Sequence, residues 1–222
     1  MANHGDAFVV SAGDERIEAR ALVLATGVVD VFPEVANLER HYGADVFTCP
    51  ACDGWEARET DTVVIGWSED VVGFALGLRR WARSVTIVTD GRRLEADEPH
   101  RARLRDAGVD VIEDDATELV GERGELRGVV LRARGLVVCR MVFFSIDTRL
   151  ADPSAEKLGC EISEEGFVVV DWDAMTSVPG VYAAGDMTPG PQLVQIAAAE
   201  GAVAGIACAK ALGRRVVSSP PT

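Results

Sequence analysis

Apolar and polar residues are arranged along the chain in blocks that predict an α/β fold. Residues 21–25 are an unbroken apolar run, which is typical of a strand covered on both faces, as in a parallel sheet, and residues 62–65 predict another buried strand. A strand at 84–88, a helix at 98–107 and a strand at 109–112 follow. Before the strand at 84–88, apolar residues recur at helical spacing and predict another helix. This stripe consists of Val71, Val72, Ala75, Leu78, Trp81 and Ala82. The resulting β-α-β-α-β order is the signature of a doubly wound nucleotide-binding unit.

Shorter elements are predicted on both sides of this unit. A turn at Gly13 separates two short strands, which predicts a hairpin. Gly121, Gly124 and Gly135 punctuate three short strands that we expect to form a meander. The last third of the chain predicts two strands and a long Ala-rich helix. The expected ranges are 8–11 and 16–19 for the hairpin, 117–120, 127–131 and 136–139 for the meander, 141–146 for a buried strand, 166–170 and 181–184 for the later strands, and 193–212 for the helix.

Charge and cysteine usage narrow the possible functions. The chain carries 22 Lys+Arg against 36 Asp+Glu, a net charge of -14, so a nucleic acid is not expected as a partner. The N-terminus has no signal pattern, and we expect no apolar run near the ~20 residues that span a bilayer. These features predict a cytoplasmic protein without a membrane partner. An odd number of cysteines, five, argues against a structural disulfide framework in that reducing compartment.

The sharpest chemical feature is the run CPACDG at residues 49–54. Cys49 and Cys52 are two residues apart at the expected start of a helix or tight turn, where they can form a reducible disulfide. The helix N-terminus also lowers the pKa of a thiol. Asp53 follows at once and offers a carboxyl group for proton transfer. A zinc site and plain core cysteines are the alternatives, but zinc needs four ligands and no second close pair exists. We therefore expect a redox dithiol and no metal.

A weaker motif stands where a dinucleotide fingerprint belongs, after one strand and before a helix. Gly66 keeps the first glycine of that fingerprint, but Ser68 replaces the second and Val71 the third. The position of the motif predicts a nicotinamide cofactor, whereas its residues weaken that prediction.

The end of the next predicted strand leaves the choice of nucleotide open. Asp90 suits a ribose 2′-hydroxyl, as in NAD sites. Arg92 and Arg93 suit a 2′-phosphate, as in NADP sites. A solvated turn of mixed charge is the alternative without any ligand.

A third motif lies in residues 176–186, where an apolar strand ends in Gly185 and Asp186. A carboxylate at the carboxyl edge of a sheet can accept a hydrogen bond from a ribityl hydroxyl. The helix expected to begin near Leu193 would direct its positive end toward a flavin and favour the anionic reduced form. The alternative is a buried strand followed by a turn aspartate.

Together these motifs resemble the low-molecular-weight thioredoxin reductase family. Residues 25–27, with Thr26 and Gly27, are similar to its Ala-Thr-Gly segment, and residues 49–54 to its active-site motif. Residues 176–186 and the helix start at 192–201 are similar to its second FAD motif. The resemblance implies two nucleotide-binding, Rossmann-like domains, of which the FAD domain is discontinuous and N-terminally truncated. We expect an FAD remnant at 1–36, an NAD(P)-binding-like domain at 37–147, and the rest of the FAD domain at 148–222.

The resemblance also implies roles for individual residues. Cys49 and Cys52 would form the redox disulfide, with Cys52 next to the flavin and Asp53 as acid/base. FAD and NADP, or NAD, would be the cofactors, and a thioredoxin-like protein or a small-molecule disulfide or dithiol the partner. A homodimer is a further expectation. The expected cofactor-binding residues are Thr26, Gly27, Gly66, Ser68, Arg92, Arg93, Gly185, Asp186, Gln192 and Leu193.

The chain departs from the family pattern in several places. Nothing before Phe8 provides the first Gly-x-Gly-x-x-Gly turn, and about 80–100 residues are expected to be missing, judged from the size of such a half-domain. Asp147 stands where the family has Gly, and Leu193 where it has Gln. Residues 55–58 resemble a subgroup with members that oxidise small dithiols using oxygen. An oxidase and a truncated, non-catalytic remnant therefore remain as alternative functions.

Overall fold

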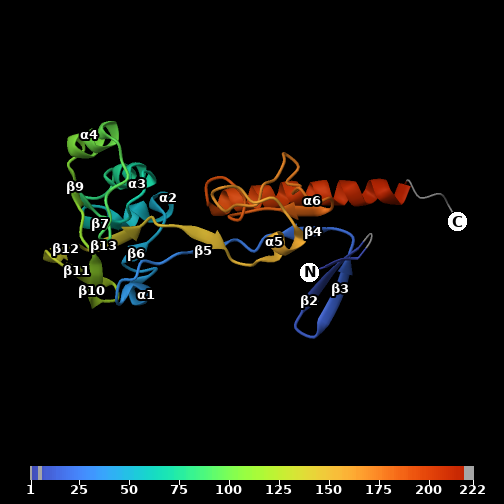
Figure 1. Ribbon diagram of the computed structural model, residues 1–222, viewed down its shortest axis with the longest axis horizontal. Coiled ribbons are helices and arrows are strands. Elements are labelled where there is room, and N and C mark those ends of the chain that lie inside the picture. Colours follow the sequence, from blue (N-terminus) through green and yellow to red (C-terminus); the bar gives the residue numbers. More distant parts are fainter. Residues whose placement is uncertain (1, 5–6, 218–222) are drawn as a thin grey trace. The chain divides into compact units, whose positions relative to one another are not determined.

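The computed structural model describes residues 2–4 and 7–217 and divides the chain into two compact units (Figure 1). Unit 1 is Met1–Val29 with Thr148–Thr222, and unit 2 is Asp30–Asp147. The first boundary falls seven residues before the expected position at 36/37. Phe32 and Val35 explain the difference, because both pack in the core of unit 2.

Unit 2 is built on a five-stranded sheet in which all neighbouring strands are parallel (Figure 1). Of these five strands β13 comes last in the chain, but it lies between β6 and β7, so the chain order reverses there. In sheet order the strands are β6 Val46–Phe47, β13 Met141–Phe144, β7 Asp61–Ile65, β8 Ser84–Val88 and β9 Val109–Ile112. Helices α3 Asp70–Leu78 and α4 Glu98–Asp106 connect β7, β8 and β9, which confirms the predicted β-α-β-α-β unit.

Both faces of this sheet are buried, as expected for a parallel sheet. Val64 packs with α3 and α4 on one face, whereas Val63 and Ile65 belong to the core on the other. The second face is covered by α1 Leu38–His41 and by a three-stranded antiparallel meander, as predicted. The meander strands are β10 Ala116–Glu122, β11 Glu125–Leu131 and β12 Gly135–Val138. The short helix α2 Pro50–Asp53 and the 3-10 helix η1 Gly54–Ala57 link β6 to β7.

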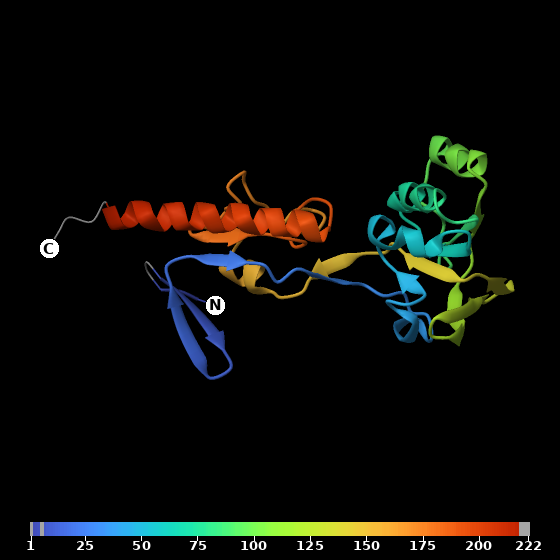
Figure 2. The same cartoon turned by 180° about the vertical axis from the view of Figure 1, so that it is seen from behind.

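Unit 1 combines segments from the two ends of the chain (Figure 2). Strand β4 Leu22–Leu24 pairs in parallel with β15 Val181–Ala183. Val181 and Ala183 pack into one core cluster and Tyr182 into another with Ala204 of the long helix α6 Val194–Val217. The remaining elements are the antiparallel sheet β1 Ala2–His4, β2 Ala7–Ala12 and β3 Glu15–Ala19, which contains the predicted hairpin, and helix α5 Ser154–Leu158. Strands β5 Val28–Asp30 and β14 Thr148–Leu150 form a separate two-stranded sheet.

Three sequence-based expectations about these elements are wrong. Residues 166–170 form no continuous strand, because Val168 and Val170 make only isolated bridges, to Ile162 and Thr176. Strand β4 is not covered on both faces, since Val23 is 43% exposed. Trp81 lies beyond the end of α3 and is 42% exposed, so it does not belong to the buried stripe.

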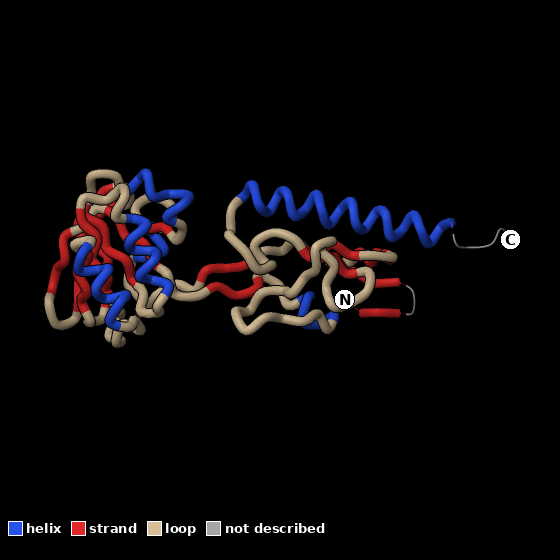
Figure 3. Tube along the Cα trace, turned by 90° about the horizontal axis from the view of Figure 1, so that it is seen from above, coloured by secondary structure: helices blue, strands red, loops and turns tan. Residues whose placement is uncertain are grey.

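Helix α6 also departs from the expectation that no apolar segment reaches membrane-spanning length (Figure 3). Its stretch Val194–Gly213 is long and apolar enough to cross a membrane by length and composition, with a mean hydropathy of 1.4. Alanine, glycine and valine make up most of this stretch. The sequence pattern did not predict an apolar run here, because so many of these residues are small. Only 6% of this stretch is buried.

Candidate functional site

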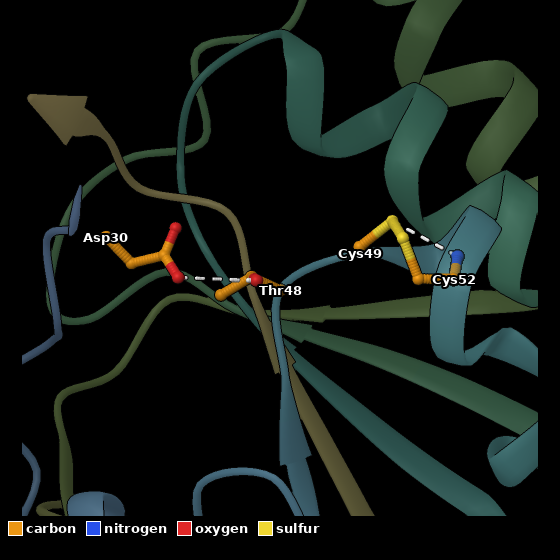
Figure 4. The surroundings of a disulfide bond; sticks show 4 residues. All are labelled: Asp30, Thr48, Cys49 and Cys52. Atoms are coloured by element: carbon orange, nitrogen blue, oxygen red, sulfur yellow. Dashed lines mark hydrogen bonds between the residues drawn. A yellow bond between two sulfur atoms is a disulfide. The ribbon is translucent and has the colours of Figure 1, made fainter. Parts of the chain in front are cut away.

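The structure joins Cys49 and Cys52 in a disulfide at the start of α2 (Figure 4). Cys49 is the N-cap residue, and Pro50 occupies the first helical position, where its fixed φ suits a helix start. The Cys49 Sγ accepts a hydrogen bond from the Cys52 backbone N–H at 3.1 Å, and the two Cα atoms are 5.2 Å apart. Cys49 is half-buried and Cys52 is exposed. The local turn therefore holds the two sulfur atoms together and leaves Cys52 accessible.

Asp53 ends α2 directly after Cys52 and is half-buried. Burial, and then the negative charge of Glu56, raise the pKa of the Asp53 carboxyl group. A raised pKa keeps the proton on this group to a higher pH than on a solvated aspartate. Asp53 is thus suited to exchange a proton with a thiol next to it.

An aromatic pair adjoins the disulfide through η1. The rings of Trp55 and Trp81 meet edge to face with centroids 5.6 Å apart. A Cβ on Gly54 would come within 2.8 Å of Trp81 Cδ1, so the glycine after Asp53 leaves room for that ring. The Arg58 guanidinium lies 4.5 Å from the Trp55 ring centroid. Sequence reasoning missed this packing, although the tryptophans themselves were visible.

The residues expected to bind a pyridine nucleotide lie at the carboxyl ends of β7 and β8, as the fingerprint requires. Gly66 is buried and directly follows β7, and Ser68 precedes α3 and is half-buried. Arg92 packs on Trp67, with its guanidinium carbon 3.7 Å from the ring centroid. Arg93 is exposed. The structure therefore brings the Gly66 turn and the arginine turn together, through a tryptophan that the sequence did not single out.

Asp90 is not freely available at this edge. Its Oδ1 accepts a hydrogen bond from the Ala116 backbone N–H at 3.3 Å, and burial raises the pKa of its carboxyl group. Two exposed arginines beside a carboxylate bonded to the backbone fit a 2′-phosphate better than a bare ribose hydroxyl. The residues present thus fit NADP in preference to NAD.

The expected flavin-binding residues gather within unit 1. Thr26 and Gly27 follow β4, and Gly185 and Asp186 follow its neighbour β15. The Thr26 hydroxyl lies 3.9 Å from the Met187 sulfur as donor to acceptor. Parallel strands place their carboxyl ends at one edge, so both motifs reach the same edge of the sheet.

Glu200 of α6 holds the loop after β15 in place. Its Oε2 accepts hydrogen bonds from the Gly185 backbone N–H at 2.8 Å and from the Thr188 hydroxyl at 2.9 Å. Among the described residues, the half-buried Asp186 carboxylate has no hydrogen-bond or ion-pair partner. A rigid loop with a free carboxylate at a sheet edge fits FAD. Glu200 lies within the stretch 192–201 that resembles the second FAD motif, but the sequence alone gives this residue no role.

Gln192 and Leu193 lie immediately before α6, which begins at Val194. The Leu193 carbonyl accepts hydrogen bonds from the backbone N–H groups of Ile196 and Ala197, so it belongs to the first turn. Both residues are half-buried at the end of the helix that faces the Gly185 loop. In the part of the chain that the structure describes, no group of three His, Cys, Asp or Glu side chains is placed to hold a metal ion.

Comparisons with known proteins agree with these arrangements. Residues 3–201 match the family model described as pyridine nucleotide-disulphide oxidoreductase. A thioredoxin reductase of Mycolicibacterium smegmatis is 32% identical over 192 residues, covering 82% of this chain and 61% of that protein. A component of the Pseudomonas putida alkyl hydroperoxide reductase is 31% identical over 204 residues, covering 88% of this chain and 39% of the relative. The crystal structure of a thioredoxin reductase from Streptococcus pyogenes MGAS5005 superposes with a TM-score of 0.88 at 26% identity, covering 96% of this chain and 72% of that one. The chain therefore spans less than two thirds of the length of the first two relatives.

Proposed function

The chain belongs to the pyridine nucleotide-disulphide oxidoreductase family, and on that premise we propose that it is a flavin-dependent thiol–disulfide oxidoreductase. The observation that carries this proposal is the disulfide Cys49–Cys52 with the half-buried Asp53 beside it. Thioredoxin reductases among its relatives act on sulfur groups and use FAD and NADPH. The proposal for this chain is the same class of reaction.

In the proposed reaction, the Cys49–Cys52 disulfide accepts two electrons and two protons and becomes a dithiol. FAD, when bound, would take two electrons from NADPH and pass them to the disulfide, which leaves NADP and restores oxidised FAD. The reduced pair then attacks the disulfide of a partner, passes through a mixed disulfide and closes again, which leaves the partner as a dithiol. Asp53 gives and takes the proton of the neighbouring thiol, and its raised pKa brings its proton affinity closer to that of a thiol.

The chain's own residues divide the cofactor-binding work between its units. Thr26, Gly185 and Asp186 would hold FAD, with Asp186 accepting a hydrogen bond from a ribityl hydroxyl. Arg92 and Arg93 would hold the 2′-phosphate of NADP at the edge of unit 2. Free thiols such as Cys139 and Cys208 are compatible with a reducing cytoplasm, where we place the reaction. A thioredoxin-like protein is the proposed partner.

Oxidation of a small dithiol, with oxygen as the final electron acceptor, is a second candidate, and it is favoured by the residues around Gly66. Ser68 and Val71 replace two glycines of the nucleotide fingerprint, and Val71 is fully buried against the turn. A weakened nicotinamide site would suit a scaffold that draws electrons from its substrate. The direction of electron flow therefore separates the two candidates.

The test is a visible absorbance spectrum of the purified chain with added FAD, followed by NADPH or by a small dithiol. The result expected of a reductase is that NADPH bleaches the bound flavin and that the electrons then reduce the Cys49–Cys52 disulfide. Cys52→Ser should abolish this reduction of the disulfide. Bleaching by the dithiol alone identifies the oxidase. Failure of the chain to retain FAD contradicts both candidates for this polypeptide.

A further inference from the structure

A hydrogen-bonded cluster lies behind the dithiol, on the N-terminal side of Cys49. Asp30 Oδ2 accepts a hydrogen bond from the Tyr42 hydroxyl at 2.8 Å and a longer one from the Thr48 hydroxyl at 3.5 Å. Figure 4 shows the Thr48 side chain turned toward Asp30 and the disulfide on the other side. Thr48 is the residue that precedes Cys49, so the cluster reaches the dithiol through one peptide bond.

The cluster is fixed to the core of unit 2 by the Tyr42 ring. That ring packs against Phe32 at a centroid distance of 4.9 Å and against Phe144 at 6.2 Å. Phe144 is buried in the interior strand β13. Asp30 is therefore bonded to a rigid hydroxyl, and it can transmit that rigidity to Thr48.

The charge of Asp53, the proposed acid/base residue, also affects the cluster. The pKa of the Tyr42 phenol is raised by burial and by its hydrogen bond to Asp30, while Thr48 lowers it. The charge of Asp53 also raises it. The pKa of the Tyr42 hydroxyl thus depends in part on the charge of the carboxyl group that follows Cys52.

Positioning matters most in the reduced chain, where no covalent bond holds the two sulfur atoms together. Cys49 must keep its place as N-cap of α2 for its Sγ to remain beside Cys52. A fixed Thr48 limits the conformations that the Cys49 backbone explores. Restricting two reacting groups in this way raises their effective concentration.

We propose that Asp30, acting through Thr48, is a positioning residue that raises the effective concentration of the Cys49–Cys52 pair. This inference rests on the proposed redox function of the dithiol. It identifies a carboxylate that lies 18 residues before Thr48 in the chain and that no sequence motif contains.

The experiment equilibrates the full chain in glutathione buffers of graded ratio, followed by alkylation of free thiols and peptide mass mapping. The equilibrium is dithiol plus oxidised glutathione giving disulfide plus two reduced glutathione molecules. Thr48→Val removes the hydroxyl at nearly constant volume, and Asp30→Asn weakens the acceptor. The Thr48–Asp30 contact of 3.5 Å is at the long limit for an O–H···O hydrogen bond, so its loss corresponds to about a factor of three. We expect both variants to favour the dithiol by about threefold, a shift of about 15 mV to less negative potential.

Asp114→Asn is the matched control. Asp114 is another hydrogen-bonded carboxylate of unit 2; it is buried, whereas Asp30 is half-buried, and it accepts hydrogen bonds from the backbone N–H groups of Ala133 and Arg134. It follows β9, which is the sheet edge opposite β6, the strand that leads to Thr48. This control removes a comparable charge and weakens the fold, but we expect its glutathione equilibrium to match the unaltered chain.

A second readout separates positioning from loss of structure. The chain has two tyrosines, Tyr42 and Tyr182, so the absorbance of tyrosinate reports on Tyr42 once Tyr42→Phe has assigned its transition. Asp30→Asn is expected to lower the pKa of Tyr42 and Thr48→Val to raise it, although both shift the redox equilibrium in the same direction. General loosening would move both properties together.

Two results would overturn the inference. One is a glutathione equilibrium in Thr48→Val and Asp30→Asn equal to that of the unaltered chain. The other is an equal shift in Asp114→Asn. If the unaltered chain itself never interconverts Cys49–Cys52 in these buffers, the proposed function fails and the positioning role fails with it. If Asp30→Asn does not fold, Thr48→Val decides the question.

Discussion

Replacing Gly66 by alanine tests whether this glycine is required by packing alone. An added Cβ would come within 2.6 Å of the Ser145 carbonyl oxygen and within 2.9 Å of Val71 Cγ2. The first contact is with backbone at the end of β13, which sits between two strands of the sheet and cannot move independently. The Val71 side chain is fully buried and has little room to turn.

The expected cost follows from these two contacts. Overpacking a core position destabilises a protein by about 1–3 kcal/mol. Replacing glycine by alanine lowers the conformational entropy of the unfolded chain, which stabilises the folded state by about 0.4–1 kcal/mol. We therefore expect Gly66→Ala to lower the free energy of unfolding by about 1–2 kcal/mol. The cost of Gly66→Ala should be smaller, but not zero, when it is measured in a Val71→Ala background, because the contact with Ser145 remains.

Gly73→Ala is the control of opposite sign. Gly73 lies within α3, and a Cβ there would meet nothing within 4 Å. Alanine at an exposed helix position stabilises by about 1 kcal/mol relative to glycine. Two identical substitutions seven residues apart should thus shift stability in opposite directions.

Urea unfolding followed by tryptophan fluorescence measures both effects. Trp55, Trp67 and Trp81 lie in unit 2, and Trp172 in unit 1 is fully exposed, so Trp172→Phe removes the background of the other unit. A midpoint for Gly66→Ala equal to or above that of Gly73→Ala would refute the packing argument. It would then leave close approach of a nucleotide as the reason for the glycine.

Three further predictions concern the titratable groups. The pKa of Asp53 is raised in the folded chain, so its ionised form destabilises the fold once the pH rises above the pKa that Asp53 has in the unfolded chain. Asp53→Asn should therefore raise the urea midpoint at pH 7 and leave it unchanged at about pH 3, where the carboxyl group is protonated in both states; a lower midpoint at pH 7 contradicts the burial argument. The Arg83 and Ser84 hydrogen bonds lower the pKa of Asp61 to about 2, so its contribution to stability is fully present above the unfolded pKa and is lost as pH falls through 2. Because the Asp61 side chain is 35% exposed, Asp61→Asn should cost less than about 1 kcal/mol at pH 7, and acid unfolding curves should show that cost shrinking as pH falls through 2. Burial raises the pKa of the Cys139 thiol to about 12. A chromogenic aromatic disulfide at pH 8 should therefore modify Cys208 in the oxidised chain, Cys49 and Cys52 in addition after mild reduction, and Cys139 and Cys160 only in denaturant. Rapid modification of Cys139 in the folded chain contradicts its burial.

The doubly wound sheet of unit 2 was predictable because its strands carry the signal locally. Runs such as Val63–Val64–Ile65 are apolar on both faces, and the apolar residues of α3 recur at helical spacing. Residues 166–170 have a similar composition, yet no neighbouring strand pairs with them continuously. Apolar residues predict burial, whereas a strand also requires a partner in register, which a local pattern does not contain.

The same distinction applies to the candidate sites. The Cys49–Cys52 pair and the Gly185-Asp186 turn are contiguous motifs, and the sequence identified both. Glu200 reaches Gly185 across 15 residues, and Asp30 reaches Tyr42 across 12. The stacking of Arg92 on Trp67 likewise depends on neighbouring strands. Contacts that position a site come from tertiary packing, so they carried no motif that could be read beforehand.

The central claim is that Cys49 and Cys52 form a reversible redox pair. The most direct measurement equilibrates the unaltered chain between reduced and oxidised glutathione and identifies the linked cysteines by peptide mass. The account predicts one two-electron transition that links Cys49 to Cys52, with Cys139 and Cys160 remaining thiols throughout. A chain in which Cys49 and Cys52 stay reduced under oxidising conditions, or pair with other cysteines, would contradict it.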